Sequence, residues 1–394
     1  MQQPLCYNLR MKRFCLALFA LSLLFGVSGP IEAAGPIKIG LTLGLSGKYS
    51  EMSDMQMKGL KLWEKEVNSK GGILGKSVQV IIYDDKSDTR VARSLYENLL
   101  SKDRVDLVFG PYSSQITEAI LPVTEKNGYP VLVSGASADK LWEKGYKYVF
   151  GTYTPASKYA VGFLEMLVAQ DLNDIAIVYA DDLFSTDIAS GTRKWAERFG
   201  LRTLLYEGFK DTSNFDELAR TVRAANVQVL IVCGHFDASV ALRLSLKKIG
   251  WYPRAYFASV GPTMQAFYDR LKKDVENVFS SSQWERLITK PFPGCCEFHE
   301  RFVKAYKKEP SYHAATAYAA GQILEAAVKR AGSLDRDKVR DMLASMEAMS
   351  IMGRYGVNRT GKQIKHFNLI IQWQNGRKEV VWPDVLRTAK PVFR

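Results

Sequence analysis

Apolar and polar positions follow one repeated pattern after Pro36. Short runs rich in Val, Ile and Leu alternate with longer segments in which apolar residues recur every three or four positions. Short runs of this kind are typical of buried strands, and the longer segments are typical of amphipathic helices. Strands are predicted at 37–43, 78–83, 105–109, 130–134, 174–179, 203–207, 228–232, 255–258 and 276–281. Helices are predicted near 53–69, 88–101, 114–126, 155–170, 185–199, 214–225, 237–249 and 263–272.

This alternation predicts an α/β fold. Strands separated by crossover helices form parallel sheets that carry helices on both faces. From residue 296 the pattern becomes helical, at about 296–307, 312–331 and 335–346, and it returns to strands at about 350–357 and 364–373. We expect these late strands to complete sheets begun earlier. A chain of 394 residues is long enough for two lobes, each with its own core.

The N-terminus predicts a secretory signal peptide over residues 1–33. Arg10, Lys12 and Arg13 precede an uncharged run from Phe14 to Val27, and small residues follow it. The apolar run is too short to cross a membrane comfortably, and no later segment reaches that length. We expect cleavage after Ala33, with either Met1 or Met11 as the start.

Charge and cysteines narrow the classes of function. The formal net charge is +13, but basic residues are interspersed with acidic ones on the predicted helices, and no groove-reading motif is present, so no nucleic-acid partner is expected. Cys233, Cys295 and Cys296 follow the leader, and adjacent cysteines form a disulfide only with strain. No Cys or His has a second ligand at zinc-like spacing, so neither a metal nor another cofactor is expected.

One strand end carries the features of an anion site. The buried run at 105–109 breaks at Gly110-Pro111 and is followed by Tyr112, Ser113 and Ser114 at the start of a helix. Free N–H groups, the helix dipole and two hydroxyls there suit a carboxylate, although ordinary N-capping explains the same residues. The run at 227–234, followed by His235, repeats this layout, so two strand ends are expected to form a cleft.

Motifs for catalysis are not matched. The loop from Gly44 to Lys48 lacks the glycine and the hydroxyl residue of a phosphate-binding loop, and residues 134–137 are not a nucleophile elbow. The pairs Asp84-Asp85 and Asp181-Asp182 are compatible with acid–base chemistry or Mg²⁺ binding, but after a strand such pairs are more often loop and cap residues. We therefore expect a binding protein and not an enzyme.

Several segments together resemble one known family. They are 37–47 (IKIGLTLGLSG), 70–75 (KGGILG), 82–85 (IYDD), 109–114 (FGPYSS), 134–137 (SGAS), 371–376 (IQWQNG) and 381–383 (VWP). In order and spacing they are similar to the periplasmic leucine/isoleucine/valine-binding proteins, which are type I solute-binding proteins of ABC importers. The resemblance implies two Rossmann-like lobes joined by three crossover hinge strands.

The resemblance also implies an organisation and a role. The N-terminal lobe is expected at 34–152 plus about 283–350, and the C-terminal lobe at 153–282 plus about 351–394. A monomer in the periplasm would close on a small carboxylate-bearing ligand and deliver it to the membrane permease subunits of an importer. The alternative is a ligand-sensing subunit for a separate receptor or kinase.

Site residues carried over from the family come from both lobes. The carboxylate-binding serine falls on Ser114, the Gly-Ala-Thr segment falls on Gly135 to Ser137, and the aromatic positions of the second lobe fall on Phe184 and on His235 or Phe236. The expected ligand-binding residues are Tyr49, Met52, Tyr112, Ser113, Ser114, Gly135, Ala136, Ser137, Phe184, His235, Phe236 and Val260.

Two features depart from the family pattern. The cysteine pair of the first lobe falls on Ser87 and Ser113, and the glutamate that meets the ligand's ammonium falls on Val260. A buried ammonium without a counter-charge costs several kcal/mol. Two ligand classes therefore stay open. One is amino acids or amides, with Asp181, Asp182 or Asp237 in place of the glutamate, and the other is aromatic or branched organic acids without an amine.

Overall fold

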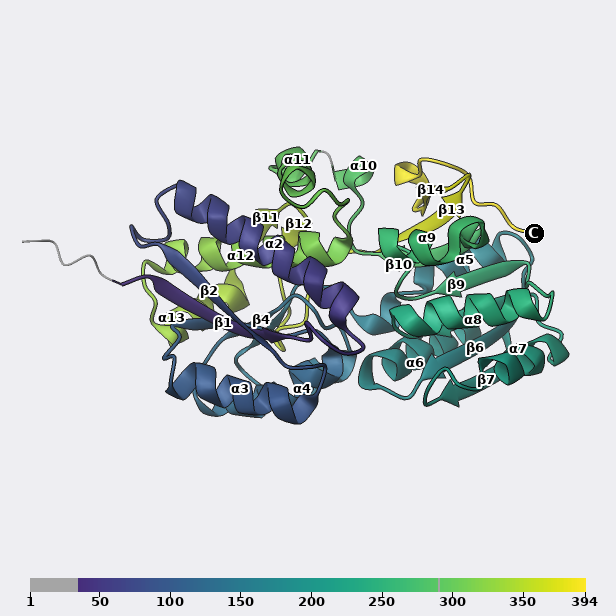
Figure 1. Ribbon diagram of the computed structural model, residues 1–394, viewed down its shortest axis with the longest axis horizontal. Coiled ribbons are helices and arrows are strands. Elements are labelled where there is room, and N and C mark those ends of the chain that lie inside the picture. The colour runs from purple at the N-terminus through teal and green to yellow at the C-terminus, as the bar shows by residue number, and fades with distance from the viewer. Residues whose placement is uncertain (1–34, 290) are drawn as a thin grey trace, which may run out of the picture. The chain divides into compact units, whose positions relative to one another are not determined.

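The computed structural model describes residues 35–289 and 291–394. The predicted signal peptide at 1–33 lies outside these residues. None of the helices in the described ranges is long and apolar enough to cross a membrane. Residues Ile37–Arg394 form one unit by their internal contacts, and this unit contains two large sheets (Figure 1).

The first sheet contains five parallel strands in the order β2-β1-β3-β4-β5. Their bounds are β1 Ile37–Leu43, β2 Val78–Asp84, β3 Leu107–Phe109, β4 Val131–Val133 and β5 Val149–Gly151. Its helices are α2 Ser50–Ser69, α3 Thr89–Ser101 and α4 Ser114–Lys126, later joined by α11 Cys295–Tyr306, α12 Tyr312–Ala331 and α13 Arg336–Ser345. Figure 1 shows α3 and α4 together on one side of the sheet and α2 on the other.

Close packing of α2 on α12 depends on two glycines. A Cβ atom on Gly59 would collide with the backbone of Ala314, and one on Gly321 would collide with the Trp63 ring. Trp63 is buried and packs edge-to-face on Phe109 of β3, so this helix pair is pressed against the first sheet. The C-terminal helices therefore complete the lobe that the N-terminal strands begin.

The second sheet has seven strands in the order β14-β13-β10-β9-β8-β6-β7. Their bounds are β6 Asp174–Ala180, β7 Arg202–Phe209, β8 Val229–Cys233, β9 Ala255–Ala258, β10 Val278–Ser282, β13 Leu369–Gln374 and β14 Arg377–Trp382. The first five are parallel, whereas β13 runs antiparallel to β10 and β14 antiparallel to β13. Its helices are α5 Val161–Val168, α6 Leu183–Arg198, α7 Phe215–Ala224, α8 Phe236–Lys248 and α9 Gln265–Leu271.

Three passages of chain connect the two sheets, and hydrogen bonds tie them together. Thr154 N donates to Gln283 Oε1 at 3.1 Å, joining the first passage to the second. His366 Nε2 lies 3.0 Å from the Gln283 carbonyl oxygen, and Gln363 Nε2 lies 3.5 Å from the Thr152 carbonyl oxygen. The predicted α/β class with two Rossmann-like lobes and three crossovers is confirmed. The exact lobe boundaries stay a prediction.

Some predicted elements were wrong in extent. The helix expected at 155–170 is a short 3-10 turn, η2 (Ala156–Lys158), followed by α5. The strand expected at 350–357 is a small hairpin of β11 (Ala348–Ser350) and β12 (Gly353–Tyr355), because the chain turns back at Ile351-Met352. The strand β5 and the short helix α10 (Arg286–Thr289) were not predicted.

Candidate functional site

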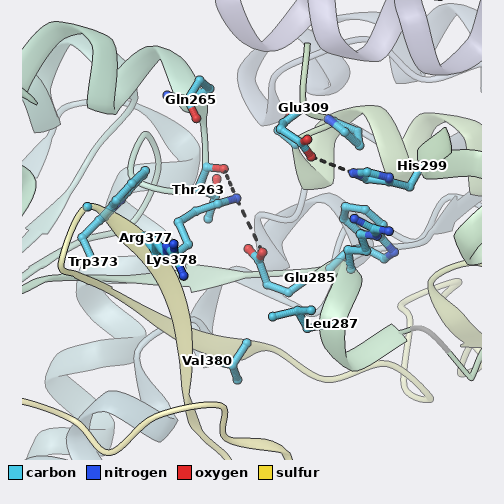
Figure 2. Close-up of a pocket in the computed structure, with 15 residues that line it drawn as sticks. Thr263, Gln265, Glu285, Leu287, His299, Glu309, Trp373, Arg377, Lys378 and Val380 are labelled. Carbon is cyan, nitrogen blue, oxygen red and sulfur yellow. Dashed lines mark hydrogen bonds and ion pairs between the residues drawn. The ribbon is translucent and has the colours of Figure 1, made fainter. Parts of the chain in front are cut away.

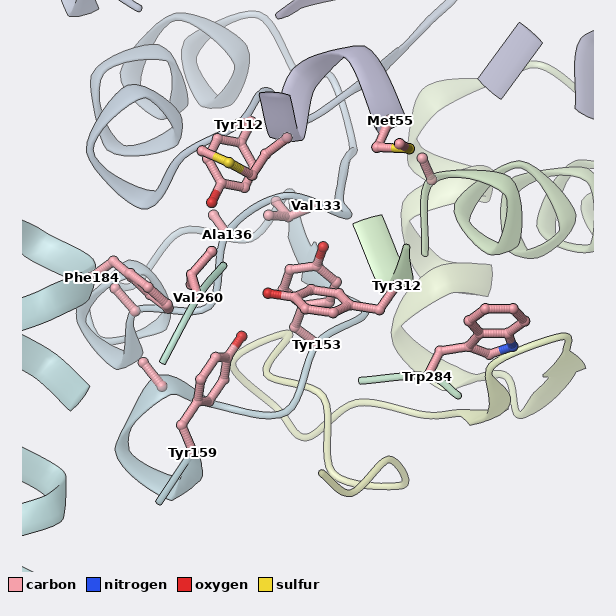
Figure 3. Close-up of a cluster of buried hydrophobic side chains, with 14 of the residues drawn as sticks. Met55, Tyr112, Val133, Ala136, Tyr153, Tyr159, Phe184, Val260, Trp284 and Tyr312 are labelled. Atoms are coloured by element: carbon pink, nitrogen blue, oxygen red, sulfur yellow. The ribbon is translucent and has the colours of Figure 1, made fainter. Parts of the chain in front are cut away.

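A cavity of about 10 Å³ lies where the carboxyl ends of strands from both sheets meet. From the first lobe it is lined by Tyr112, Ser113, Ser114, Gly135, Ala136, Ser137 and Tyr312, and from the first crossover by Tyr153 and Tyr159. From the second lobe it is lined by Phe184, His235 and Val260, each of which follows a strand of the second sheet. Figure 3 shows Tyr112, Ala136, Val260 and Phe184 close together, with Tyr153, Tyr159 and Tyr312 to the right of and below them in this view.

The serines at the start of α4 face this cavity without capping the helix. Ser113 is the N-cap residue, but its side chain makes no capping bond, and its buried hydroxyl has no hydrogen-bond partner within residues 35–289 and 291–394. Ser114 Oγ accepts two backbone N–H groups, from Ser137 at 3.2 Å and from Ala138 at 3.1 Å. With its lone pairs occupied, the Ser114 hydroxyl keeps its proton available for another acceptor.

The loop after β4 forms the other wall of this anion site. A Cβ atom on Gly135 would lie 2.7 Å from Gln56 Nε2 and 2.8 Å from the Pro111 carbonyl oxygen, so only glycine fits. Ser137 Oγ donates to Tyr159 Oη at 3.0 Å, which ties the loop to the first crossover. The first-turn N–H groups of α4 and the serine hydroxyls therefore make a set of donors suited to a carboxylate.

The wall from the second lobe is mainly apolar. Phe184 and Val260 are buried, at 6% and 1% exposure, and His235 is its one polar side chain among the described lining residues. No Asp, Glu, Lys or Arg side chain belongs to the lining in the part of the chain that the structure describes. A charged group of a ligand would therefore meet no opposite full charge in the wall itself.

Asp182 lies behind His235 and is held by the start of α6. Its Oδ1 accepts the N–H groups of Phe184 and Ser185, both at 3.0 Å, and its Oδ2 accepts the Ser185 hydroxyl at 2.8 Å. Burial alone would raise the pKa of Asp182, but the charge of His235 and the hydrogen bonds from Ser185 outweigh it and lower the pKa to about 2. Asp182 is thus an ionised carboxylate whose lone pairs are largely used.

His235 contacts the first lobe directly. Its Nδ1 lies 3.2 Å from Tyr112 Oη, and its ring packs edge-to-face against the rings of Tyr49 and Tyr112. Its Nε2 lies 3.6 Å from Asp182 Oδ1, longer than a hydrogen bond, and that nitrogen is buried without a hydrogen-bond partner among the described residues. His313 also lies near, with its ring against Tyr112 and both ring nitrogens unpartnered in the same set.

The sequence did not point to three of the tyrosines in the cavity. Tyr153 and Tyr159 lie on the first crossover, and Tyr312 begins α12. Burial raises the pKa of each hydroxyl well above its ordinary value, so all three are neutral. They supply flat apolar surface together with hydroxyls, a combination that suits a partly polar aromatic body.

Nine of the twelve expected residues line the cavity. They are Tyr112, Ser113, Ser114, Gly135, Ala136, Ser137, Phe184, His235 and Val260. Tyr49 lies outside the lining but contacts the rings of Tyr112 and His235, whereas Met52 and Phe236 are buried without lining the cavity. Of the two candidates for the second aromatic position of the second lobe, the geometry thus favours His235 over Phe236. That these residues bind a ligand stays a prediction.

Of the other aspartates, Asp181 and Asp237 are exposed. Asp84 and Asp85 brace the loop after β1. Asp84 accepts the Ser46 hydroxyl, and Asp85 accepts the Thr42 hydroxyl and the Ser87 N–H. No group of three His, Cys, Asp or Glu residues that could hold a metal ion is found in the described residues.

A larger cavity of about 300 Å³ lies beside the second crossover, between α11 and the β13–β14 hairpin. Figure 2 shows contacts among the residues that line it: Lys378 Nζ lies 2.8 Å from the Thr263 carbonyl oxygen and 3.5 Å from Glu285, and His299 Nε2 lies 2.7 Å from Glu309. Leu287 on its rim is 64% exposed. None of the expected ligand-binding residues lines it, so the smaller cavity is the candidate site.

Comparisons with known proteins agree with this architecture. The family model described as periplasmic binding protein matches residues 36–378. The Leu/Ile/Val-binding protein homolog 7 of Brucella suis biovar 1 is 26% identical over 387 residues, covering 93% of this chain and 96% of that protein.

Two solved structures show the same fold. The branched-chain amino acid transporter substrate-binding protein LivJ from Streptococcus pneumoniae, in complex with isoleucine, aligns with a TM-score of 0.80 at 23% identity, over 88% of this chain and 100% of that one. A solute-binding protein from R. palustris, in complex with benzoate, aligns with a TM-score of 0.78 at 18% identity, over 91% and 98%.

Proposed function

The chain belongs to the periplasmic binding protein family, and from this premise we propose that it captures a small carboxylate-bearing solute between its two lobes for an ABC importer. The family is one of binding proteins and not of enzymes. A location in the periplasm and delivery to membrane permease subunits follow from the same proposal, together with the predicted signal peptide. Capture by hinge closure fits a site to which both lobes contribute.

The observation that carries the proposal is the hydrogen bonding of Ser114. Two backbone N–H groups donate to its oxygen, so its lone pairs are occupied and its own proton is left to donate to a ligand. The neighbouring Ser113 hydroxyl is buried and unpartnered as well. Buried polar groups left without partners cost about 1–3 kcal/mol each, and a carboxylate would satisfy both hydroxyls together with the α4 N-terminus.

The wall opposite this anion site favours an acid without an amine. Val260 occupies the position where the family pattern has a glutamate, and it is buried in the lining. Asp182 is the nearest described carboxylate to His235, but three hydrogen bonds already hold its two oxygens. An ammonium in this cavity would therefore lack a free counter-charge, whereas an aromatic or branched body would contact Phe184 and the tyrosines.

The first test is a screen followed by one substitution. Thermal-shift measurements with leucine, isoleucine, benzoate and branched aliphatic acids identify the class that binds. Calorimetry with the best ligand then compares the wild type with Ser114→Ala. Losing a charge-assisted hydrogen bond should weaken binding by about 1.5–3 kcal/mol, which is roughly ten- to a hundred-fold.

Ser280→Ala is the matched control. Ser280 is also buried, and its hydroxyl donates to the Ala258 carbonyl in the second sheet, away from the cavity lining. This variant should lower the melting temperature without changing affinity. Equal affinities for wild type and Ser114→Ala would refute the anion site, and an absence of binding by every acid and amino acid would refute the proposed function.

A further inference from the structure

Asp187 of the second lobe contacts the first lobe outside the lining of the candidate site. It lies on α6, which packs beside α4 of the first lobe (Figure 1), and it is buried, at 8% exposure. Its Oδ2 accepts the backbone N–H of Lys140 at 3.3 Å, and its Oδ1 lies 3.8 Å from Lys140 Nζ. Lys140 belongs to η1 (Asp139–Trp142), a 3-10 turn that follows β4 of the first sheet. The contact therefore joins the two lobes directly.

The segment that Asp187 contacts is continuous with the anion site. Ser114 Oγ accepts the N–H groups of Ser137 and Ala138, and Lys140 follows shortly after them in the chain. Residues 137–140 are thus held at one end by the first lobe and at the other end by a carboxylate of the second lobe. A ligand bound beside Ser114 and the contact made by Asp187 should stabilise each other, because coupling between two contacts of one segment is reciprocal.

Other bonds of η1 do not involve Asp187. Asp139 Oδ2 accepts the N–H of Ser157, in the first crossover, at 2.9 Å. Asp139 Oδ1 accepts a hydrogen bond from Lys362 Nζ, in the third crossover, also at 2.9 Å. These bonds hold the turn to two of the three crossovers. Removing the Asp187 carboxylate should therefore leave the anion site formed and release only its attachment to α6.

We propose that Asp187 is a positioning residue that holds the lobes closed around a bound solute and so sets how long the solute stays bound. This inference rests on the proposed function and adds to it a residue outside the cavity lining. Because the Lys140 N–H donates to a carboxylate of the other lobe, this bond has to break for the lobes to separate. An enclosed solute leaves only after that separation, so the bond acts on the rate of dissociation.

The test measures the dissociation rates of benzoate and of leucine by stopped flow at pH 8, for the wild type and for Asp187→Ala. Alkaline pH is used because burial raises the pKa of Asp187, and an ionised carboxylate makes the stronger bond. Loss of this buried hydrogen bond should raise the dissociation rate roughly ten- to a hundred-fold. Asp187→Asn keeps an oxygen that can accept the Lys140 N–H, so its rate should lie between the other two. It also shows the effect of losing the charge alone if Asp187→Ala folds poorly.

Two variants serve as matched controls. Lys140→Met removes the ammonium but keeps the backbone N–H, and the Lys140 side chain is 58% exposed, so the dissociation rate should rise less than about fivefold. Asp106→Ala removes another carboxylate that accepts a backbone N–H, from Lys38 at 2.8 Å, but both of these residues belong to the first lobe. This variant should lower the melting temperature and leave the dissociation rate unchanged.

The outcomes separate this inference from the proposed function. A dissociation rate for Asp187→Ala equal to that of the wild type, or an equal rise in Asp106→Ala, overturns the role of Asp187, while solute binding leaves the proposed function standing. If none of the screened acids and amino acids binds, the proposed function fails, and small-angle scattering of the ligand-free proteins then tests the contact. Asp187→Ala should have a larger radius of gyration than the wild type and Asp106→Ala, and equal radii would overturn this inference as well.

Discussion

Replacing Val260 by glutamate should change affinity in opposite directions for the two classes of ligand. Val260 is 1% exposed and lines the cavity together with the anion site, so a carboxylate introduced there would lie close to the carboxylate of a bound acid. With an effective dielectric constant of about 20, two like charges about 4 Å apart repel by about 4 kcal/mol, and at about 8 Å by about 2 kcal/mol. Benzoate should therefore bind Val260→Glu at least roughly thirty-fold more weakly.

For leucine the same substitution supplies a counter-charge for the ammonium. Its affinity should stay the same or increase, because an ion pair replaces an unpaired buried charge. Val260→Gln is the matched control, since it has nearly the same size and shape without the charge. The difference between the Glu and Gln variants isolates the electrostatic part of the change.

Calorimetry at two pH values completes the assay. Repulsion raises the pKa of the introduced glutamate, so it takes up a proton in acid and the penalty for benzoate should be smaller at pH 5 than at pH 8. The reasoning fails if Val260→Glu weakens benzoate no more than Val260→Gln does. It also fails if leucine loses as much affinity as benzoate.

Two other substitutions test parts of the lobe that supports the anion site. Burial raises the pKa of Asp85 to about 6, although the hydrogen bond from the Thr42 hydroxyl opposes the shift. The carboxyl group of Asp85 therefore holds its proton more tightly in the folded protein than in the unfolded chain, and the stability of the protein should fall as pH rises from about 4 to about 6. The Asp85→Asn variant should not show this fall in stability. In urea unfolding it should be roughly 1–3 kcal/mol more stable than the wild type at pH 7, and no more stable at pH 4. An equal gain at both pH values would contradict the raised pKa of Asp85. Gly135→Ala would press a methyl group on Gln56 and on the Pro111 carbonyl, so calorimetry should show at least tenfold weaker binding, whereas unchanged affinity would show that the loop has room.

Much of the fold could be predicted from local pattern. The strands at 37–43 and 255–258 have the same bounds in the structure, because each apolar run is bounded by polar or turn-forming residues. The three-residue strand β5 offers too few positions for a periodic signal. The hairpin of β13 and β14 did have a signal that was not used, since Asn375 and Gly376 both have positive φ and form the tight turn typical of that pair.

The candidate site also has residues that the local sequence could place and residues that it could not. Ser114, Ser137 and His235 each follow a strand at the edge where parallel sheets present their ligand sites, so sequence order places them. Tyr153, Tyr159 and Tyr312 come from a crossover and from the start of a helix more than 150 residues later in the chain, and their meeting depends on how the lobes are joined. The position of Asp182 behind His235 also depends on a long-range contact, although its capping of α6 is local.

The Tyr112–His235 contact has a consequence for the rate of binding. A cavity of about 10 Å³ has room for about one water molecule, so under the proposed function a solute would enter only after the two side chains and their lobes have separated. The observed association rate should then rise with solute concentration and level off at the rate of that separation. An importer supplied by such a protein would have its uptake at high solute concentration limited by an internal motion of the binding protein and not by encounter.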